Sequence, residues 1–263
     1  MSRAAELLLL PGMAQDERAY ELAGLGHART FVYPGHGDRA AVPVTLEGLA
    51  DEAMVRASGP VDLVGVALGG IVGQHILARH GGRVRSAVLA NTPGDVSAPA
   101  ALHARAAATR ADGPNAAELL PRWLRSATVT AGGPAIDYLR EVLAGISWEG
   151  LAEVQAAMAD HNAMDALRGD PHPVTFVIGE DDHVGIGATE RLAEAFPTRR
   201  VVRIPGGHMV HLDNPRGFRE AVEEHLAWVD ALGDLGLGDP RHDDLGHDDP
   251  ATRTPREEDG HDG

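Results

Sequence analysis

The sequence contains no cysteine and no lysine, and aromatic residues make up only 4% of its 263 positions. Without cysteine, disulfides, a thiolate nucleophile and a cysteine-ligated metal site are all excluded. Arginine supplies all 23 basic side chains, which we attribute to coding bias and not to phosphate binding. Long apolar runs are also missing, because no window approaches the roughly 20 continuous apolar residues of a membrane span.

Positive charge is scarce overall, since the formal net charge is −16. Nucleic acid or an anionic membrane would need a basic field to attract it, so neither is an expected partner. We expect a cytoplasmic protein that acts on a small-molecule substrate and uses no cofactor and no metal, while its oligomeric state stays open. The apolar run Leu7–Leu10 follows Glu6 and ends at Pro11, which indicates a first strand and not a signal peptide.

Short runs rich in Val, Ile and Leu alternate with longer amphipathic stretches along most of the chain. This pattern predicts βαβ units, and therefore an α/β fold with a mostly parallel central sheet flanked by helices. The predicted strands cover residues 6–10, 30–33, 61–66, 86–91, 174–179 and 201–204. The predicted helices cover residues 16–23, 46–57, 68–80, 188–196 and 215–232.

The alternation stops between residues 97 and 170, where alanine-rich helical patterns carry several large side chains. We therefore expect a helical cap, 97–170, inserted into a core made of residues 1–96 and 171–232. Trp123 and Trp148 are candidates for lining a substrate pocket, although packing of the insertion explains them as well. Residues 233–263 carry seven of the net negative charges and few aliphatic side chains, which is typical of a disordered acidic tail. The His-Asp pairs of this tail could bind a metal ion loosely, but a solvated tail is the favoured interpretation.

The most informative stretch is Leu-Val-Gly-Val-Ala-Leu-Gly-Gly at residues 63–70, between a predicted buried strand and a predicted helix. Gly65, Gly69 and Gly70 stand where the G-x-S-x-G nucleophile elbow needs residues without a Cβ, and Ala67 occupies the position of the serine. An oxyanion would be stabilised at the helix N-terminus there. Because a methyl group cannot attack a carbonyl, the chain as written cannot form an acyl-enzyme.

Residues 65–91, GVALGGIVGQHILARHGGRVRSAVLAN, resemble the elbow, helix and next strand of α/β-hydrolases of the 3-oxoadipate enol-lactonase and small-esterase type. The resemblance covers about residues 7–91 and 174–228 and implies the α/β-hydrolase fold with a helical cap. It implies that the acid of the triad is Asp182, with Asp181 as the close alternative. It also implies that the base is His208, with His211 as the less favoured alternative.

The same resemblance implies an oxyanion hole made by the backbone N–H groups of Met13 and Leu68. Pro11 stands where the family commonly has histidine, which alters the rim of the hole and leaves the Met13 donor in place. The segment Pro34–Asp38 resembles the Gly-His-Gly turn of the family, and we interpret it as structural.

These residues support three hypotheses about function. The first is an enzyme of ester or enol-lactone hydrolase lineage that acts on a small carbonyl-containing substrate, with Ala67 either native or an engineered replacement of serine. The second is a lyase with a native Ala67, in which His208 and Asp182 act as a general base for decarboxylation or elimination through an enolate. Members without the serine, resembling methyl ketone synthases, give this reading a family precedent. The third is a small-molecule receptor without catalytic activity.

Overall fold

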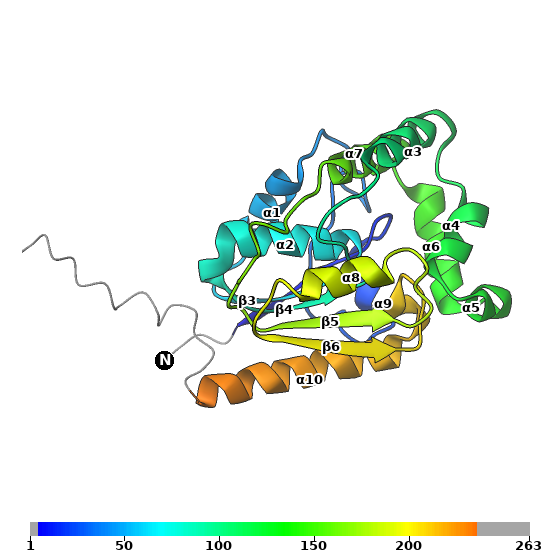
Figure 1. The fold of residues 1–263 in the computed structure, drawn as a ribbon. Coiled ribbons are helices and arrows are strands. Elements are labelled where there is room, and N and C mark those ends of the chain that lie inside the picture. Colours follow the sequence, from blue (N-terminus) through cyan, green and yellow to red (C-terminus); the bar gives the residue numbers. More distant parts are fainter. Residues whose placement is uncertain (1–4, 236–263) are drawn as a thin grey trace, which may run out of the picture.

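The computed structural model describes residues 5–235, and its centre is one six-stranded parallel sheet (Figure 1). The strands follow the order β2-β1-β3-β4-β5-β6 across the sheet, and each neighbouring pair is parallel. Their bounds are β1 Glu6–Leu10, β2 Arg29–Thr30, β3 Val61–Val66, β4 Val84–Ala90, β5 Val174–Gly179 and β6 Arg199–Ile204. This architecture confirms the predicted fold class.

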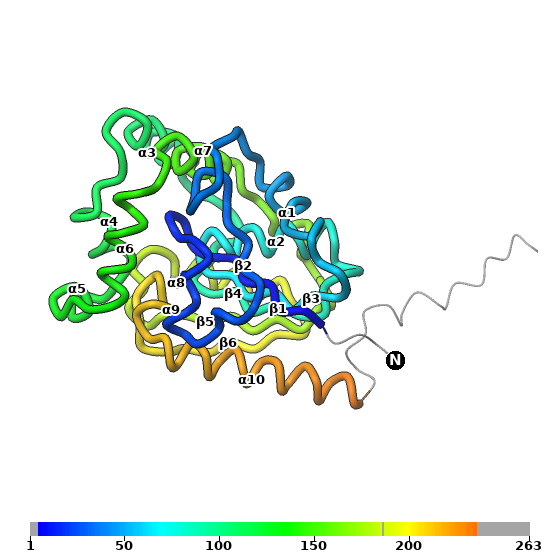
Figure 2. The backbone as a smooth tube through the Cα atoms, turned by 180° about the vertical axis from the view of Figure 1, so that it is seen from behind, coloured from blue at the N-terminus to red at the C-terminus, as the bar shows by residue number. Residues whose placement is uncertain are grey.

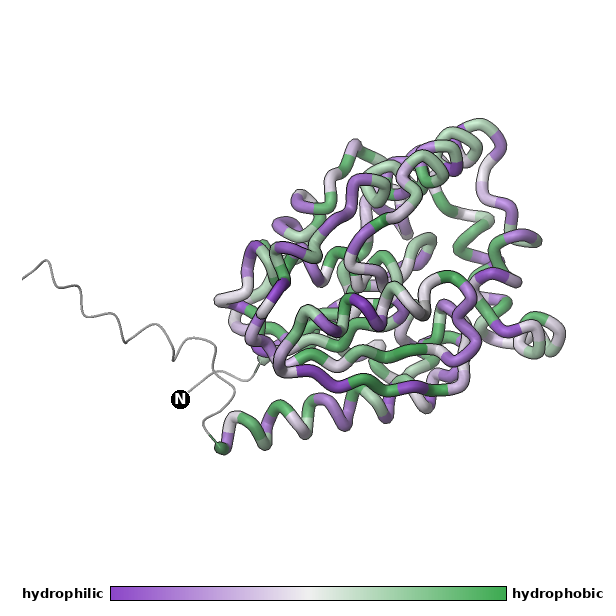
Figure 3. Tube along the Cα trace, in the orientation of Figure 1, coloured by the Kyte–Doolittle hydropathy of each residue, from purple (hydrophilic) through white to green (hydrophobic). Residues whose placement is uncertain are grey.

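Helices cover both faces of the sheet. Helices α1 (Leu46–Val55), α2 (Leu68–His80) and α8 (Ile186–Ala193) lie on one face, and α10 (Pro215–Asp234) lies on the other (Figure 1). Because both faces are covered, every residue of β3 and β5 is buried, as expected for strands that are apolar apart from one polar residue each, Asp62 and Thr175. Figure 3 shows that the central strands are mainly apolar, whereas polar and apolar residues alternate along α10.

The second strand is shorter than predicted. Residues 30–33 were expected to form it, whereas pairing with β1 extends only over Arg29 and Thr30. The backbone N–H of Phe31 still donates to the carbonyl of Leu9, at 2.9 Å. Beyond it the chain bends into the turn that begins at Pro34, so its remaining apolar residues pack against the core without extending the ladder.

The segment between β4 and β5 is helical, which confirms the predicted helical insertion. Its helices are α3 (Pro99–Asp112), α4 (Ala116–Trp123), α5 (Ser126–Ala131), α6 (Pro134–Gly145) and α7 (Trp148–Ala159). Asn115 and Ser147 cap α4 and α7 by accepting hydrogen bonds from backbone N–H groups of the first turn. Both views of the chain place α4 to α6 beyond the carboxyl ends of the strands (Figures 1 and 2).

Two further predictions concern the ends of the chain and the membrane. Within residues 5–235, no helix combines the length and the apolar character needed to cross a bilayer. The helix α10 continues through Asp234, two residues beyond its predicted end. The rest of the predicted acidic tail, residues 236–263, lies outside the described residues.

Candidate active site

The candidate site begins at the junction between β3 and α2, where Ala67 joins the two elements. Its backbone has φ 53° and ψ −111°, a region that L-residues rarely adopt. Its N–H donates to the carbonyl of Ala90 on the neighbouring strand, at 2.9 Å. Three non-glycine residues of the described chain have a positive φ, namely Ala14, Ala67 and Asn91. Each such residue costs about 1–3 kcal/mol, and such strain concentrates at functional sites.

Close backbone packing explains the glycines around Ala67. A methyl group at Gly69 would overlap the carbonyl oxygen of Leu10, and one at Gly65 would lie 2.5 Å from the carbonyl oxygen of Gly69. The end of β1 therefore lies directly against the first turn of α2. This contact brings the loop after β1 beside the elbow, which is the arrangement that an oxyanion hole requires.

The structure brings the predicted acid and base together. Asp182 follows β5, and its carboxylate is buried. Each of the two carboxylate oxygens lies 3.2 Å from Nδ1 of His208. Oδ1 of Asp182 also accepts a hydrogen bond from the N–H of Val184, at 2.8 Å. A carboxylate at Nδ1 favours the tautomer with the proton on Nδ1, so Nε2 keeps its lone pair and can accept a proton.

The two alternative residues lie elsewhere. Asp181 is exposed, and its N–H donates to the carbonyl of Gly206 at 2.9 Å. His211 is fully buried, and its Nε2 lies 3.1 Å from Oε1 of Gln15. Burial and, to a smaller extent, the nearby His208 lower the pKa of His211 to about 3. Among the described residues, Asp181 makes no hydrogen bond to His208, and His211 makes none to Asp182.

The predicted oxyanion donors lie on the loop after β1 and at the start of α2. The N–H of Gly12 donates to Oε1 of Gln15 at 3.0 Å, and the N–H of Ala14 donates to Nε2 of His36 at 3.2 Å. Among the hydrogen bonds of residues 5–235, none uses the intervening N–H of Met13. Leu68 is the first residue of α2, so its N–H has no carbonyl partner within the helix. Both N–H groups can therefore bind a ligand oxygen.

His36 belongs to the turn that resembles the Gly-His-Gly turn, and its contacts agree with a structural role. Its Nδ1 donates to the carbonyl of Pro34 at 3.1 Å, while Nε2 accepts from Ala14. Burial lowers the pKa of His36 to about 4, which keeps the ring neutral in the form that these two hydrogen bonds require. The turn thus holds the loop that carries Met13.

The two candidate pocket tryptophans have different surroundings. Trp123, at the end of α4, is buried, and its carbonyl accepts the N–H of Met209 at 2.8 Å, next to His208. Trp148 is 49% exposed, and its indole packs over Gly113 within the cap. The structure therefore brings Trp123 to the loop of the base and places Trp148 against the cap surface.

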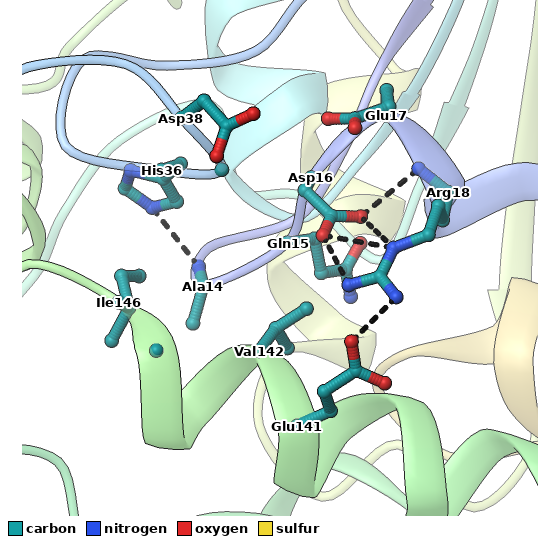
Figure 4. Close-up of a pocket in the computed structure, with 12 residues that line it drawn as sticks. Ala14, Gln15, Asp16, Glu17, Arg18, His36, Asp38, Glu141, Val142 and Ile146 are labelled. Carbon is teal, nitrogen blue, oxygen red and sulfur yellow. Dashed lines mark hydrogen bonds and ion pairs between the residues drawn. The ribbon is translucent and has the colours of Figure 1, made fainter.

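A pocket of about 300 Å³ opens beside the loop of Met13, between that loop, the turn at His36 and the cap helix α6 (Figure 4). Arg18 in its wall is paired with Asp16 and Glu141. Two further carboxylates, Glu17 and Asp38, line it as well, so the wall is negatively charged. Within residues 5–235 no group of three His, Cys, Asp or Glu side chains could hold a metal ion.

Sequence reasoning missed three buried polar side chains that surround the candidate residues. They are Gln15, which contacts Gly12 and His211; Asn91, at the end of β4; and Asp213, whose carboxylate accepts the N–H of Gly207 at 2.6 Å. Asn91 and Asp213 contact residues far away in the sequence or in another element. The sequence gives a signal for Asn91 alone, as a polar residue at the end of an apolar run, because Gln15 and Asp213 lie in polar stretches.

Comparison with known proteins agrees with this fold. The chain is 26% identical over 207 residues to 3-oxoadipate enol-lactonase 2 of Acinetobacter baylyi, covering 78% of this chain and 76% of the relative. It is 29% identical over 208 residues to pimeloyl-[acyl-carrier protein] methyl ester esterase of Chromobacterium violaceum, covering 73% of this chain and 81% of the relative. A thermophilic esterase structure from Thermogutta terrifontis superimposes with a TM-score of 0.79 at 23% identity, covering 87% of this chain and 92% of that one. Residues 7–221 match the alpha/beta hydrolase family, and the chain belongs to that family.

Proposed function

We propose that the chain is an enzyme of ester and lactone hydrolase lineage that acts on a small carbonyl-containing substrate. The contact between Asp182 and His208, beside an elbow that keeps its strained backbone, carries the proposal. The curated relatives act on an enol-lactone and a methyl ester by their names, and both substrates contain a carboxylic ester bond.

In the proposed reaction, the carbonyl oxygen of the substrate accepts hydrogen bonds from the N–H groups of Met13 and Leu68. His208 takes a proton from a water molecule through Nε2, and the water oxygen attacks the carbonyl carbon. The tetrahedral intermediate then expels the alkoxide, which receives the proton from His208. Asp182 stabilises the imidazolium that forms in between. No acyl-enzyme arises, because Ala67 has no hydroxyl.

Ala67 determines how fast this reaction can be. In a serine hydrolase, loss of the triad costs about 10⁶ in kcat, while the oxyanion hole and substrate binding still give about 10³–10⁴ over the uncatalysed reaction. We therefore expect slow hydrolysis by the chain as written. An engineered replacement of serine and a native alanine both give this result, and the response to a restored hydroxyl tests the hydrolase lineage in either case.

The test compares the chain with its Ala67→Ser variant on a panel of activated esters and enol-lactones. We expect the variant to hydrolyse at least one of them faster by several orders of magnitude, with burst kinetics from an acyl-enzyme. The matched control is the Ala67→Ser, His208→Ala double variant, in which the hydroxyl is present without its base and the gain should disappear. A folded Ala67→Ser variant with an unchanged rate on every substrate would contradict the hydrolase lineage.

A second candidate function is a lyase that removes a proton or carbon dioxide from a β-keto acid or a related substrate. The observation that favours it is an intact Asp182–His208 pair and two unpaired N–H donors around a residue that cannot act as a nucleophile. Such a site could stabilise an enolate without covalent catalysis.

The lyase candidate predicts turnover by the chain as written, loss of that turnover in His208→Ala, and no gain in Ala67→Ser. Full activity of the His208→Ala variant would exclude His208 as the base. A receptor would instead be indicated by tight binding of a carbonyl compound from which mass spectrometry detects no product.

A further inference from the structure

The carboxyl end of β4 contacts three segments of the candidate site, namely the elbow and the loops of the acid and the base. In the sheet, β4 lies between β3, which leads to the elbow, and β5, which leads to Asp182. The carbonyl of Ala90, its last residue, accepts the N–H of Ala67 at 2.9 Å. The next residue, Asn91, has φ 47° and donates its backbone N–H to the carbonyl of Val177 at 3.1 Å. The backbone here is thus fixed on both sides.

The side chain of Asn91 extends these contacts to the loops of the acid and the base. Its Oδ1 accepts the N–H of Gly179, which begins the turn leading to Asp182, at 2.9 Å. Its Nδ2 donates to the carbonyls of Gly207 at 3.0 Å and of His208 at 2.8 Å. The carbonyl of Gly179 in turn accepts the N–H of Asp182 at 3.0 Å. One side chain therefore holds the backbones from which both members of the pair extend.

An amide suits this position for physical reasons. Asn91 is 1% exposed, so each of its polar atoms needs a partner, and its one acceptor and two donor hydrogens are all used. A carboxylate of the same shape would keep the acceptor but would face two carbonyl oxygens without a hydrogen to offer. Asparagine also tolerates a positive φ better than most residues do.

We propose that Asn91 is a positioning residue, which sets the distance and orientation between Asp182 and His208 by hydrogen-bonding the backbone of both loops. The proposal rests on the proposed function in one respect, since only the catalytic consequence requires that His208 be the base. A change in the backbone of either loop would move the imidazole relative to the carboxylate. Misplacement of a reacting group by about 1 Å can cost about 100-fold in rate.

Two variants remove the contacts in different ways. Asn91→Asp keeps the shape and the Oδ1 acceptor and loses both donated hydrogen bonds. Asn91→Gly loses all three hydrogen bonds but adopts a positive φ without strain. It therefore serves as the test if Asn91→Asp does not fold. The matched control is Ser86→Ala, which removes a buried hydroxyl of β4 that donates to Asp62 of β3, away from the carboxyl end of the sheet.

The first measurement is the tautomer of the His208 ring, read from its two nitrogen-15 resonances in labelled protein, with His208→Ala to assign them. The chain and Ser86→Ala should show one tautomer, with the proton on Nδ1. Asn91→Asp and Asn91→Gly should shift His208 toward a mixture of tautomers. A single unchanged tautomer in a folded Asn91 variant, or a mixture in the unmodified chain, would overturn the proposal.

The second measurement uses the Ala67→Ser background, in which turnover is expected. Adding Asn91→Gly should lower kcat about 10- to 100-fold and leave KM within about two-fold, because the residue does not contact the substrate. Adding Ser86→Ala should leave both constants unchanged. An unchanged kcat with Asn91→Gly would also overturn the proposal. Failure of the proposed function looks different, since Ala67→Ser itself would then be inactive while the tautomer measurement still responds to Asn91.

Discussion

Acidification should destabilise this protein steeply, because the fold buries four neutral histidines. Burial lowers the pKa to about 4 for His36 and His161 and to about 3 for His211 and His225. Each of the four rings is at most 2% exposed. His172 behaves differently, since hydrogen bonding and attraction to Asp170 overcome the effect of burial and raise its pKa.

The sign follows from proton binding. Between pH 6.5 and about 4, each of the four histidines is protonated in the unfolded chain and neutral in the folded one, so the unfolded state binds more protons and stability falls as the pH falls. From pH 7 to pH 5 the loss is slightly under about 2 kcal/mol for each histidine, or about 7–8 kcal/mol for the four together. A typical domain has a free energy of unfolding of about 5–15 kcal/mol, so the change is large enough to unfold the chain.

Urea unfolding followed by circular dichroism at several pH values between 7 and 5 measures this slope. The matched variant is His225→Gln, which cannot titrate and can still hydrogen-bond Thr175, the partner of Nδ1 at 2.8 Å. The number of protons taken up on unfolding, which sets this slope, should fall by close to one in His225→Gln, whatever the substitution does to the free energy of unfolding at pH 7. A slope below about one proton for the parent chain, or the same slope in both proteins, would refute the reasoning.

Three further changes test the packing around the site, each by urea unfolding at pH 7. Gly69→Ala should cost about 3 kcal/mol or more, because the added methyl group overlaps the carbonyl of Leu10 and must displace the end of β1 and the loop that carries Met13. Asp213→Ala should cost about 1–3 kcal/mol, since it leaves the buried N–H of Gly207 and the part-buried donors of Arg125 and Thr128 without this acceptor. Leu63→Ala, in the fully buried β3, should cost about 2–5 kcal/mol. The exposed Val55→Ala should change stability by less than about 0.5 kcal/mol.

Elements whose signals are local could be predicted well from the sequence. The bounds of β1, β3, β5 and α2 are those expected, because each is a buried or amphipathic run that ends at glycine, proline or a sharp turn. The second strand was predicted too long, since its end depends on where pairing with β1 stops. Pairing is a tertiary property that the apolar pattern of residues 30–33 does not contain.

The candidate site divides in the same way. The elbow could be found from its glycines, and Asp182 and His208 from a family resemblance. Asn91 could not be found, because the residue it holds most closely, His208, lies 117 positions later in the chain. The surroundings of Trp148 could not be predicted either, since a large aromatic residue in a cap suits a pocket wall and internal packing equally well. Its indole packs over Gly113.

The elbow keeps its shape without a serine because the backbone alone determines that shape. The strained φ of Ala67 is fixed by the hydrogen bond to Ala90 and by the close approach of Gly65 and Gly69, and none of these contacts involves the side chain at position 67. Restoring a hydroxyl there requires no change of backbone. Because position 67 is only 6% exposed, the new hydroxyl must find a partner or cost about 1–3 kcal/mol. If Nε2 of His208 is that partner, as the proposed function requires, the Ala67→Ser variant should be both stable and active.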